Sequence, residues 1–320
     1  MKARRFHFTS TDGLSIVCAA WEPVGPDRGV VQIAHGMGEH IGRYGELIEQ
    51  LVGAGFAAYG NDHRGHGRTA LPSGNFGDFG RGGFRLLIDD VSRLTAIARN
   101  EHRSKPLILL GHSMGSFAAQ QLAIDHSELI DGLALSGSGS LDRLVALSKS
   151  QKRPPAAIVN AAFEPARTPS DWLSRDPAVV NEFIDDPLCF AWLEPGATES
   201  FFAAASTLAD PMRLGRIRKN LPLYLFSGSD DPVGQQLDGV KTLIERYRRA
   251  GVSNISHDFY PGGRHEMLHE INRGEVQKNL LGWISAVVSA RLDGQRCEPE
   301  TTFKTKLIRP AKKFDMNEPR

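Results

Sequence analysis

A short glycine–serine motif is the part of this sequence that most directly suggests chemistry. Residues 107–117 read LILLGHSMGSF: an apolar run is followed by G-x-S-x-G around Ser113 and then by residues that favour a helix. A strand, a tight turn and a helix in this order are the context in which such a serine becomes an exposed nucleophile. Gly111 and Gly115 are expected where backbone and helix approach the turn too closely for a Cβ atom. The alternative is a chance match, because glycine and serine are common.

A serine hydroxyl is a weak nucleophile at neutral pH, so it needs a histidine base and a carboxylate that orients the base. In chains that carry this motif the order is serine, acid, histidine. Residues 222–226 predict a late strand that leads into SGSDDPV. The spacing G-x-x-D-x-V from Gly228 selects Asp231 as the acid, and Asp230 is expected to shape the turn.

The predicted base follows the last strand. Residues 256–260 predict this strand, and the glycine turn after it places His265 before a polar segment that favours a helix. His257 lies inside the strand and His269 about one helical turn further on, so both are expected at the surface or in supporting positions. His112 neighbours the serine, but its side chain leaves the turn in another direction, which favours packing or hydrogen bonding.

The same chemistry needs preorganised N–H groups for the oxyanion that appears in the transition state. One donor is expected to be the backbone N–H of Met114, directly after the nucleophile. The second should come from the loop after an early strand. Residues 29–34 predict that strand, HGMGEH at 35–40 forms the loop, and Met37 N–H is the expected donor. All four groups follow strand ends, where parallel sheets place their sites.

Alternating strands and helices predict a mostly parallel sheet with helices on both faces. The chain opens with an antiparallel hairpin over 5–22, turning at Asp12-Gly13. Further elements are predicted as helices over 43–53 and 84–100 and as strands over 56–60 and 131–136.

The alternation stops at about residue 140 and resumes at about 221. Such a stretch exceeds an ordinary connection, so we expect a core formed by residues 1–140 and 221–292 and a helical cap over 141–220. Residues 293–320 show no periodicity and are expected to form a tail. We expect the cap residues 141–220 to bind substrate, although most individual apolar members should hold the cap to the core. These members are Ile158, Phe163, Trp172, Phe183, Phe190, Trp192, Phe201 and Phe202.

Composition narrows the possible functions. The formal net charge is +1 and the hydrophobic content is 41%, which favours a globular enzyme over a nucleic-acid-binding protein. No apolar run approaches the about 20 residues that span a bilayer, and the N-terminus lacks a signal-peptide pattern. Three dispersed cysteines (Cys18, Cys189 and Cys297) match no metal spacing and favour a reducing, cytoplasmic location.

Five motifs together resemble a known family. They are HGMGEH followed by Arg43-Tyr44, DHRGHG at 62–67, GHSMG, GSDDPV from Gly228 and GRHE from Gly263. Over about residues 8–290 the chain resembles α/β-hydrolases of the monoacylglycerol lipase and lysophospholipase type, sometimes grouped with serine aminopeptidases. The resemblance implies the α/β-hydrolase fold with a helical cap insertion. Position by position it agrees with the catalytic and oxyanion residues chosen above.

The resulting hypothesis is a serine ester hydrolase that works through an acyl-enzyme. The expected partner is a small-molecule acyl ester with one long chain, such as a monoacylglycerol or a lysophospholipid. Alternatives on the same residues are a short-chain carboxylesterase, an amidase or an acyltransferase, and a ligand sensor with a slow triad is the non-enzyme alternative. No cofactor, metal, nucleic acid or transmembrane segment is expected, whereas transient contact with a membrane surface and the oligomeric state stay open.

Overall fold

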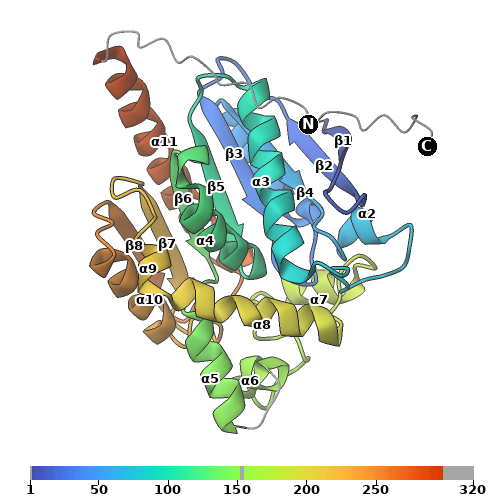
Figure 1. The fold of residues 1–320 in the computed structure, drawn as a ribbon. Coiled ribbons are helices and arrows are strands. Elements are labelled where there is room, and N and C mark those ends of the chain that lie inside the picture. Colours follow the sequence, from blue (N-terminus) through green and yellow to red (C-terminus); the bar gives the residue numbers. More distant parts are fainter. Residues whose placement is uncertain (1, 152–154, 298–320) are drawn as a thin grey trace, which may run out of the picture.

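A single sheet crosses the centre of the computed structural model, which describes residues 2–151 and 155–297 (Figure 1). Its strand order in these residues is β1-β2-β4-β3-β5-β6-β7-β8. The first two pairings, β1–β2 and β2–β4, are antiparallel, and all later neighbours are parallel. The strands are β1 (Arg4–Thr9), β2 (Ser15–Trp21), β3 (Gly29–Ala34), β4 (Phe56–Asn61), β5 (Leu107–His112), β6 (Gly132–Ser136), β7 (Leu223–Gly228) and β8 (Ile255–Tyr260).

The sequence explains why the parallel strands lie inside. Every residue of β3 (GVVQIA) and β5 (LILLGH) is buried, as expected for strands covered by helices on both faces. Gln32 is the polar exception in β3, and its amide donates to the carbonyl of Val91 at 3.0 Å. At the other end of the sheet, Gly13 adopts φ 89° in the turn between β1 and β2, which confirms the predicted hairpin.

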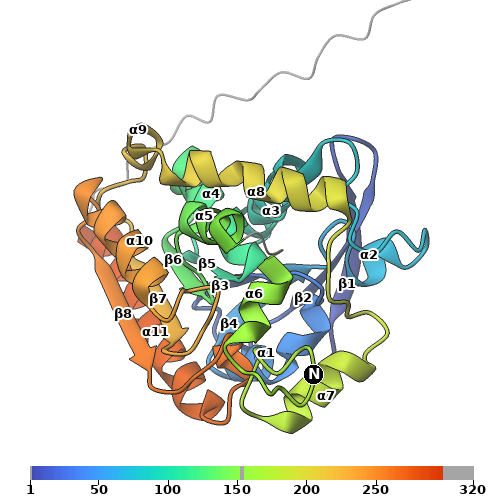
Figure 2. The ribbon, with the colours of Figure 1, turned by 90° about the horizontal axis from the view of Figure 1, so that it is seen from below.

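Helices cover both faces of the sheet (Figures 1 and 2). Side chains of α1 and α11 share one apolar core with one face, and those of α3, α4 and α10 share another core with the opposite face. This confirms the predicted architecture. None of the helices in the described residues has both the length and the apolar character to cross a membrane. The elements are η1 (Ile41–Tyr44), α1 (Gly45–Gly53), α2 (Gly67–Ala70), α3 (Gly83–Glu101), α4 (Met114–His126), η2 (Ser127–Leu129), α10 (Asp238–Arg249), η3 (Met267–His269) and α11 (Arg273–Cys297).

The chain between β6 and β7 forms helices and no strand in its described residues. These helices are α5 (Leu141–Gln151), α6 (Pro155–Ala161), α7 (Pro177–Asp185), α8 (Pro195–Ala209) and α9 (Pro211–Leu214). Helix α8 packs against α3, α4 and α5, and α5, α6 and α7 lie at the sheet end where β5 runs into α4 (Figure 1). Several begin at a proline, whose missing N–H suits a helix start. The division into core, cap and tail stays a proposal.

Three details differ from the sequence-based expectations. Helix α11 continues past Leu292 to Cys297, so the first part of the expected tail is helical, and 298–320 lie outside the described residues. The segment after His265 forms only the short η3 before α11 begins. Helix α10 was not predicted, although it buries residues at helical spacing on one face. They are Val240, Leu243, Ile244 and Tyr247.

Candidate active site

Ser113 lies at the sharp turn from β5 into α4. Its backbone has φ 50° and ψ −122°, a region that residues with a side chain rarely adopt. Both flanking glycines are needed there. A Cβ on Gly115 would lie 2.2 Å from the carbonyl oxygen of Ala34, and one on Gly111 would lie 2.6 Å from Cα of Ser116. The local strain that presents the hydroxyl is thus held by tight backbone packing on both sides.

Asp231 and His265 follow the neighbouring strands β7 and β8, and the structure brings them together. His265 Nδ1 donates to Asp231 Oδ1 at 2.9 Å, and the N–H of Val233 donates to the same oxygen at 2.9 Å. Both side chains are buried. Burial alone would lower the pKa of His265, but the carboxylates of Asp231, Glu266 and Glu39 together outweigh it, so this pKa lies above its usual value. Asp230 is exposed and accepts from the Ser229 hydroxyl at 2.9 Å, as its expected turn role requires.

Ser113 and His265 line one small pocket, although the structure places no hydrogen bond between Ser113 Oγ and the His265 ring among the described residues. Such bonds are often long without substrate and shorten in the complex. Two rings hold the imidazole, Trp172 with its centroid at 4.7 Å and His112 at 4.8 Å. Burial lowers the pKa of His112 to about 4, so it is neutral at neutral pH and packs as expected.

The two residues expected to donate to the oxyanion, Met37 and Met114, both line a cavity together with Ser113. Met114 is the first residue of α4, and Met37 lies in the loop after β3. Neither backbone N–H donates to an acceptor within the described part of the chain. The loop is held by the segment between β6 and β7, because the N–H of Phe190 donates to the carbonyl of Gly38 at 2.9 Å. Gly38 needs φ 71°, and a Cβ there would lie 1.9 Å from the Phe190 oxygen.

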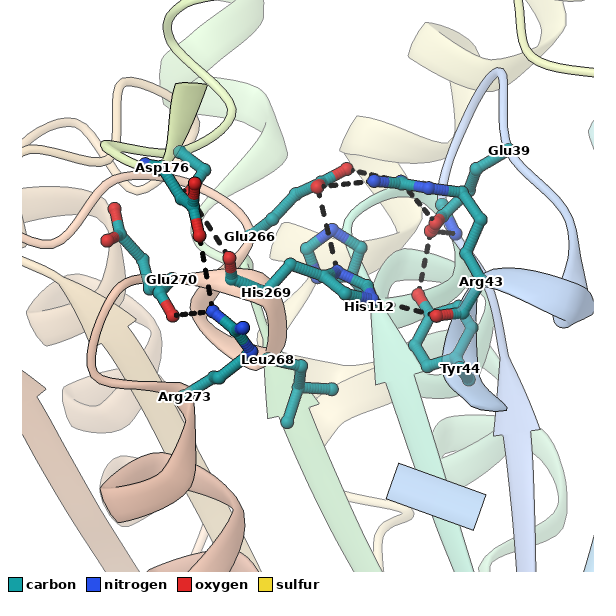
Figure 3. A network of polar contacts seen from close by, with 12 residues as sticks. Glu39, Arg43, Tyr44, His112, Asp176, Glu266, Leu268, His269, Glu270 and Arg273 are labelled. Carbon is teal, nitrogen blue, oxygen red and sulfur yellow. Dashed lines mark hydrogen bonds and ion pairs between the residues drawn. The ribbon is translucent and has the colours of Figure 1, made fainter. Parts of the chain in front are cut away.

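A buried ionic network joins this loop to the segment that carries His265 (Figure 3). Arg43 donates to both oxygens of Glu266 at 2.6 and 2.8 Å and to Glu39 at 2.9 Å. Glu39 also accepts from the Tyr44 hydroxyl at 2.7 Å and from the N–H of Gly36 at 2.5 Å. Sequence reasoning missed this network, although Glu39 and Arg43 stand four residues apart in a motif that was singled out.

The charges of this network do not balance. Burial would raise the pKa of Glu39, but Arg43 and nearby histidines lower it to about 2. At Glu266, burial would also raise the pKa, but the Arg43 guanidinium has the larger effect and this pKa is lowered. Both carboxylates are therefore ionised at neutral pH and share one guanidinium.

Two cavities meet at Ser113. One of about 400 Å³ is almost entirely apolar, and the other of about 40 Å³ contains the polar groups. Both are lined by Met37, Ser113, Trp172 and Trp192. The large cavity is completed by Met114, Phe117, Leu144, Val159, Leu193, Thr198, Phe201, Phe202 and Val233. The small one is completed by Gly36, Glu39, His112, Pro169, Ser170, Leu173, Phe183, Phe190, Ala191, His265 and Glu266.

The apolar residues predicted in the insertion take different roles. Ile158 and Phe163 line neither cavity, and the Phe163 ring lies under the Arg264 guanidinium at 4.4 Å. Phe201 lines the large cavity and also packs on Phe84 and Phe117 of the core. One side chain can therefore both line a cavity and pack the insertion against the core. The members that line a cavity are Trp172, Phe183, Phe190, Trp192, Phe201 and Phe202.

Comparison with known proteins identifies the family. The model of the family described as "Serine aminopeptidase, S33" matches residues 25–272. The chain belongs to this family. It is a serine hydrolase with the α/β-hydrolase fold, as the sequence motifs indicated.

Relatives of this serine hydrolase include lipases and esterases. A monoacylglycerol lipase from Mycolicibacterium smegmatis is 29% identical over 287 residues, which cover 87% of this chain and 95% of that protein. A thermostable carboxyl esterase from Bacillus coagulans, solved with glycerol, has a TM-score of 0.81, 29% identity, and coverage of 90% and 99%. A lipase solved in an open form has a TM-score of 0.77, 31% identity, and the same coverage. The shared chemistry is ester hydrolysis.

One cluster of potential metal ligands lies beside the site of the hydrolase. Among the described residues, side-chain atoms of His40, Asp186 and Cys189 lie within 4.8 Å of one another. His40 Nδ1 accepts from the N–H of Gly42 at 3.1 Å, so Nε2 carries the proton and donates to Asp186 at 2.8 Å. A metal at Nε2 would displace this proton and break the Gly42 bond. The arrangement thus suits a hydrogen bond between loop and insertion, and the expectation of no metal stays a prediction.

Proposed function

We propose that this hydrolase cleaves the ester of a lipid with one acyl chain, such as a monoacylglycerol, with Ser113 as nucleophile, His265 as base and Asp231 as the orienting acid. The observation that carries this proposal is the apolar cavity of about 400 Å³ that opens at Ser113. Its volume lies within the about 300–1,000 Å³ typical of small-molecule pockets. An apolar chamber beside a nucleophile suits the acyl part of a substrate.

In the first half-reaction, Ser113 Oγ attacks the acyl carbon while His265 Nε2 takes the hydroxyl proton. The tetrahedral intermediate collapses, the bond to the leaving alcohol breaks, and His265 gives this alcohol the proton. Asp231 holds the ring through Nδ1 at 2.9 Å and stabilises the imidazolium. The product is an ester between the acyl group and Ser113.

In the second half-reaction, water takes the place of the alcohol. His265 removes one proton from water as its oxygen attacks the acyl carbon, and then returns the proton to Ser113 Oγ as the acid leaves. In both steps the N–H groups of Met37 and Met114 donate to the oxyanion. Such donors act on charge that develops only in the transition state, and losing one costs about 10²–10³ in kcat.

The two cavities and the relatives support this substrate class. The larger, apolar cavity suits the acyl chain, and the smaller, more polar pocket beside His265 favours a small alcohol. The Mycolicibacterium relative carries the name monoacylglycerol lipase, and glycerol accompanies the esterase structure. A monoacylglycerol combines one long chain with a small alcohol, so it meets both requirements.

The test is acid release from a substrate panel that runs from acetyl esters to long-chain monoacylglycerols. Ser113→Ala serves as the blank, and its fold is checked by circular dichroism. We expect long single-chain esters to give the highest kcat/KM and the variant to give none. Preference for acetyl esters would overturn the lipid assignment. Full activity of the variant would overturn the role of Ser113, and a burst without turnover would favour a ligand sensor.

We also propose a cytoplasmic location, which the sparse cysteines support. Cys18 and Cys189 are both free thiols in the described residues, as is usual in reducing compartments. Subcellular fractionation of the native host tests this, and recovery of the protein in a secreted fraction would contradict it.

A further inference from the structure

We propose that the small pocket beside His265 selects the alcohol part of the substrate by charge, favouring a quaternary ammonium alcohol such as choline and rejecting a phosphorylated one. This rests on the proposed function, because it assigns the leaving alcohol to this pocket. The substrate would be an acylcholine-type ester, and its choline part would occupy the pocket. Choline is similar in size to glycerol. The ester is cleaved in the same way as in the proposed function, and the inference adds the recognition of a cation by the pocket.

The position of His265 decides which cavity receives the alcohol. The general acid must lie within hydrogen-bond reach of the leaving oxygen. His265 lines the small pocket and does not line the large apolar cavity. The leaving alcohol therefore extends into the small pocket while the acyl chain enters the large one.

Two carboxylates belong to the lining of the small pocket. Glu39 and Glu266 line it, whereas no lysine or arginine side chain of the described residues does so. Arg43 lies behind the two carboxylates and neutralises one of them. Asp231 bonds to His265, whose pKa is raised, so its carboxylate balances the imidazolium and this pair adds no net charge when His265 is protonated.

Two nearby histidines, His112 and His35, add no positive charge to the pocket. His112 also lines the pocket, and burial lowers its pKa to about 4, which keeps it neutral. His35 is also held neutral, because burial lowers its pKa well below the usual value. His269 lies behind Glu266, with Nδ1 3.6 Å from the carboxylate, and its Nε2 donates to the carbonyl of Arg43 at 3.0 Å.

Aromatic rings supply the other walls of the pocket. Trp172, Phe190 and Trp192 line it, and their ring faces attract cations through the ring quadrupole. A fourth ring, Phe183, already lies under the Arg43 guanidinium at 5.1 Å. Trp192 is 48% exposed and makes no ring contact with another aromatic side chain in the described part of the chain. Aromatic walls with nearby carboxylates are the usual surroundings of a bound quaternary ammonium.

The same charges oppose an anionic alcohol. The phosphate of a phosphorylated glycerol would lie close to Glu39 and Glu266, within a site shielded from solvent, where like charges repel more strongly than in water. The pocket lining offers this phosphate no cationic side chain. Phosphorylated monoacylglycerols should therefore be poor substrates.

The experiment compares esters that differ only in charge. Octanoylcholine is compared with octanoyl neohexyl ester, in which carbon replaces the quaternary nitrogen, below the concentration at which either forms micelles. Monooctanoylglycerol and its phosphate ester form the second pair. We expect kcat/KM to be about 2- to 30-fold higher for the choline ester than for its neohexyl isostere, the range of cation–π attraction. The phosphate ester should be the poorest of the four.

Variants of Trp192 separate the ring from general packing. Because this side chain is half exposed, its replacement should leave the fold intact. Trp192→Leu should lower the choline-to-neohexyl ratio, and Trp192→Phe, which keeps a ring, should retain most of it. Added salt should weaken the discrimination against the phosphate ester.

The outcomes separate this proposal from the one on which it rests. Equal rates for the choline and neohexyl esters, or faster cleavage of the phosphate ester, would overturn the charge selection and leave ester hydrolysis standing. A ratio that Trp192→Leu does not change would overturn the aromatic wall. No acid release from any of the four esters would overturn the proposed function itself, and the inference with it.

Discussion

Replacing Arg43 by methionine tests whether the buried network holds the site together. The substitution keeps much of the side-chain volume but leaves Glu39 and Glu266 without their cation. Their side chains are only 2% and 3% exposed. Removing one partner of a buried ion pair costs about 3–5 kcal/mol, because the remaining charge stays buried and unpaired. Against a total stability of about 5–15 kcal/mol, this is a large part of the free energy of unfolding.

The loss should depend on pH with a definite sign. In the native protein the pKa of Glu39 is lowered to about 2, and that of Glu266 is also lowered. A carboxyl group whose pKa is lowered by folding contributes stability above its unfolded pKa of about 4.3 and loses it as the pH falls toward the folded value. In Arg43→Met, the buried carboxylates of Glu39 and Glu266 have lost their cation and can become neutral by taking up protons as the pH falls. The difference between the two proteins should therefore be largest near neutral pH and shrink below about pH 5.

Urea unfolding at several pH values, followed by tryptophan fluorescence, measures this difference. Arg249→Met is the matched control, because Arg249 pairs with Glu245 on the surface with 82% of its side chain exposed, and such pairs contribute about 0–1 kcal/mol. Adding Glu39→Gln and Glu266→Gln to Arg43→Met should restore part of the loss. A loss below about 1 kcal/mol, or one that does not change with pH, would refute the reasoning.

Four further outcomes follow from the site. Asp231→Asn should lower kcat by about 10⁴ with little change in fold, measured with a soluble ester; a small effect would contradict the assignment of the acid. Gly115→Ala should prevent correct folding of the nucleophile turn, since its Cβ would lie 2.2 Å from Ala34 O; normal activity would contradict this. Leu144→Trp should fill the large cavity, so that kcat/KM falls for long acyl chains and persists for acetyl esters. Burial lowers the pKa of His66 to about 4, so this neutral histidine should reduce stability as the pH falls from about 6.5, and His66→Gln should flatten a plot of unfolding midpoint against pH.

Local sequence predicted the chemical groups and their order along the chain. Four glycine-containing turns each follow an apolar strand, and the serine, acid and histidine appear in a fixed order. Because the carboxyl ends of parallel strands share one edge of the sheet, these turns had to converge. The structure brings His265 against Asp231 at this edge, although 34 residues separate them in the chain. Helix α10 was not predicted, although its sequence carries the 3.6-residue pattern of an amphipathic helix.

Other features depended on distant pairings that no local pattern encodes. Arg43 and Glu266 are 223 positions apart. In the sequence, neither residue can be told from an ordinary charged residue at the surface. Trp172 belongs to the insertion, yet its ring packs on His265 of the core. The sizes of the two cavities depend on how the insertion packs on the strand ends. Sequence by itself therefore determined the fold class and predicted the candidate reacting groups, because periodicity and turn chemistry are local. Only the tertiary structure decided the charge of the site, the support of its histidine and the space offered to a substrate, because these arise where separate segments meet.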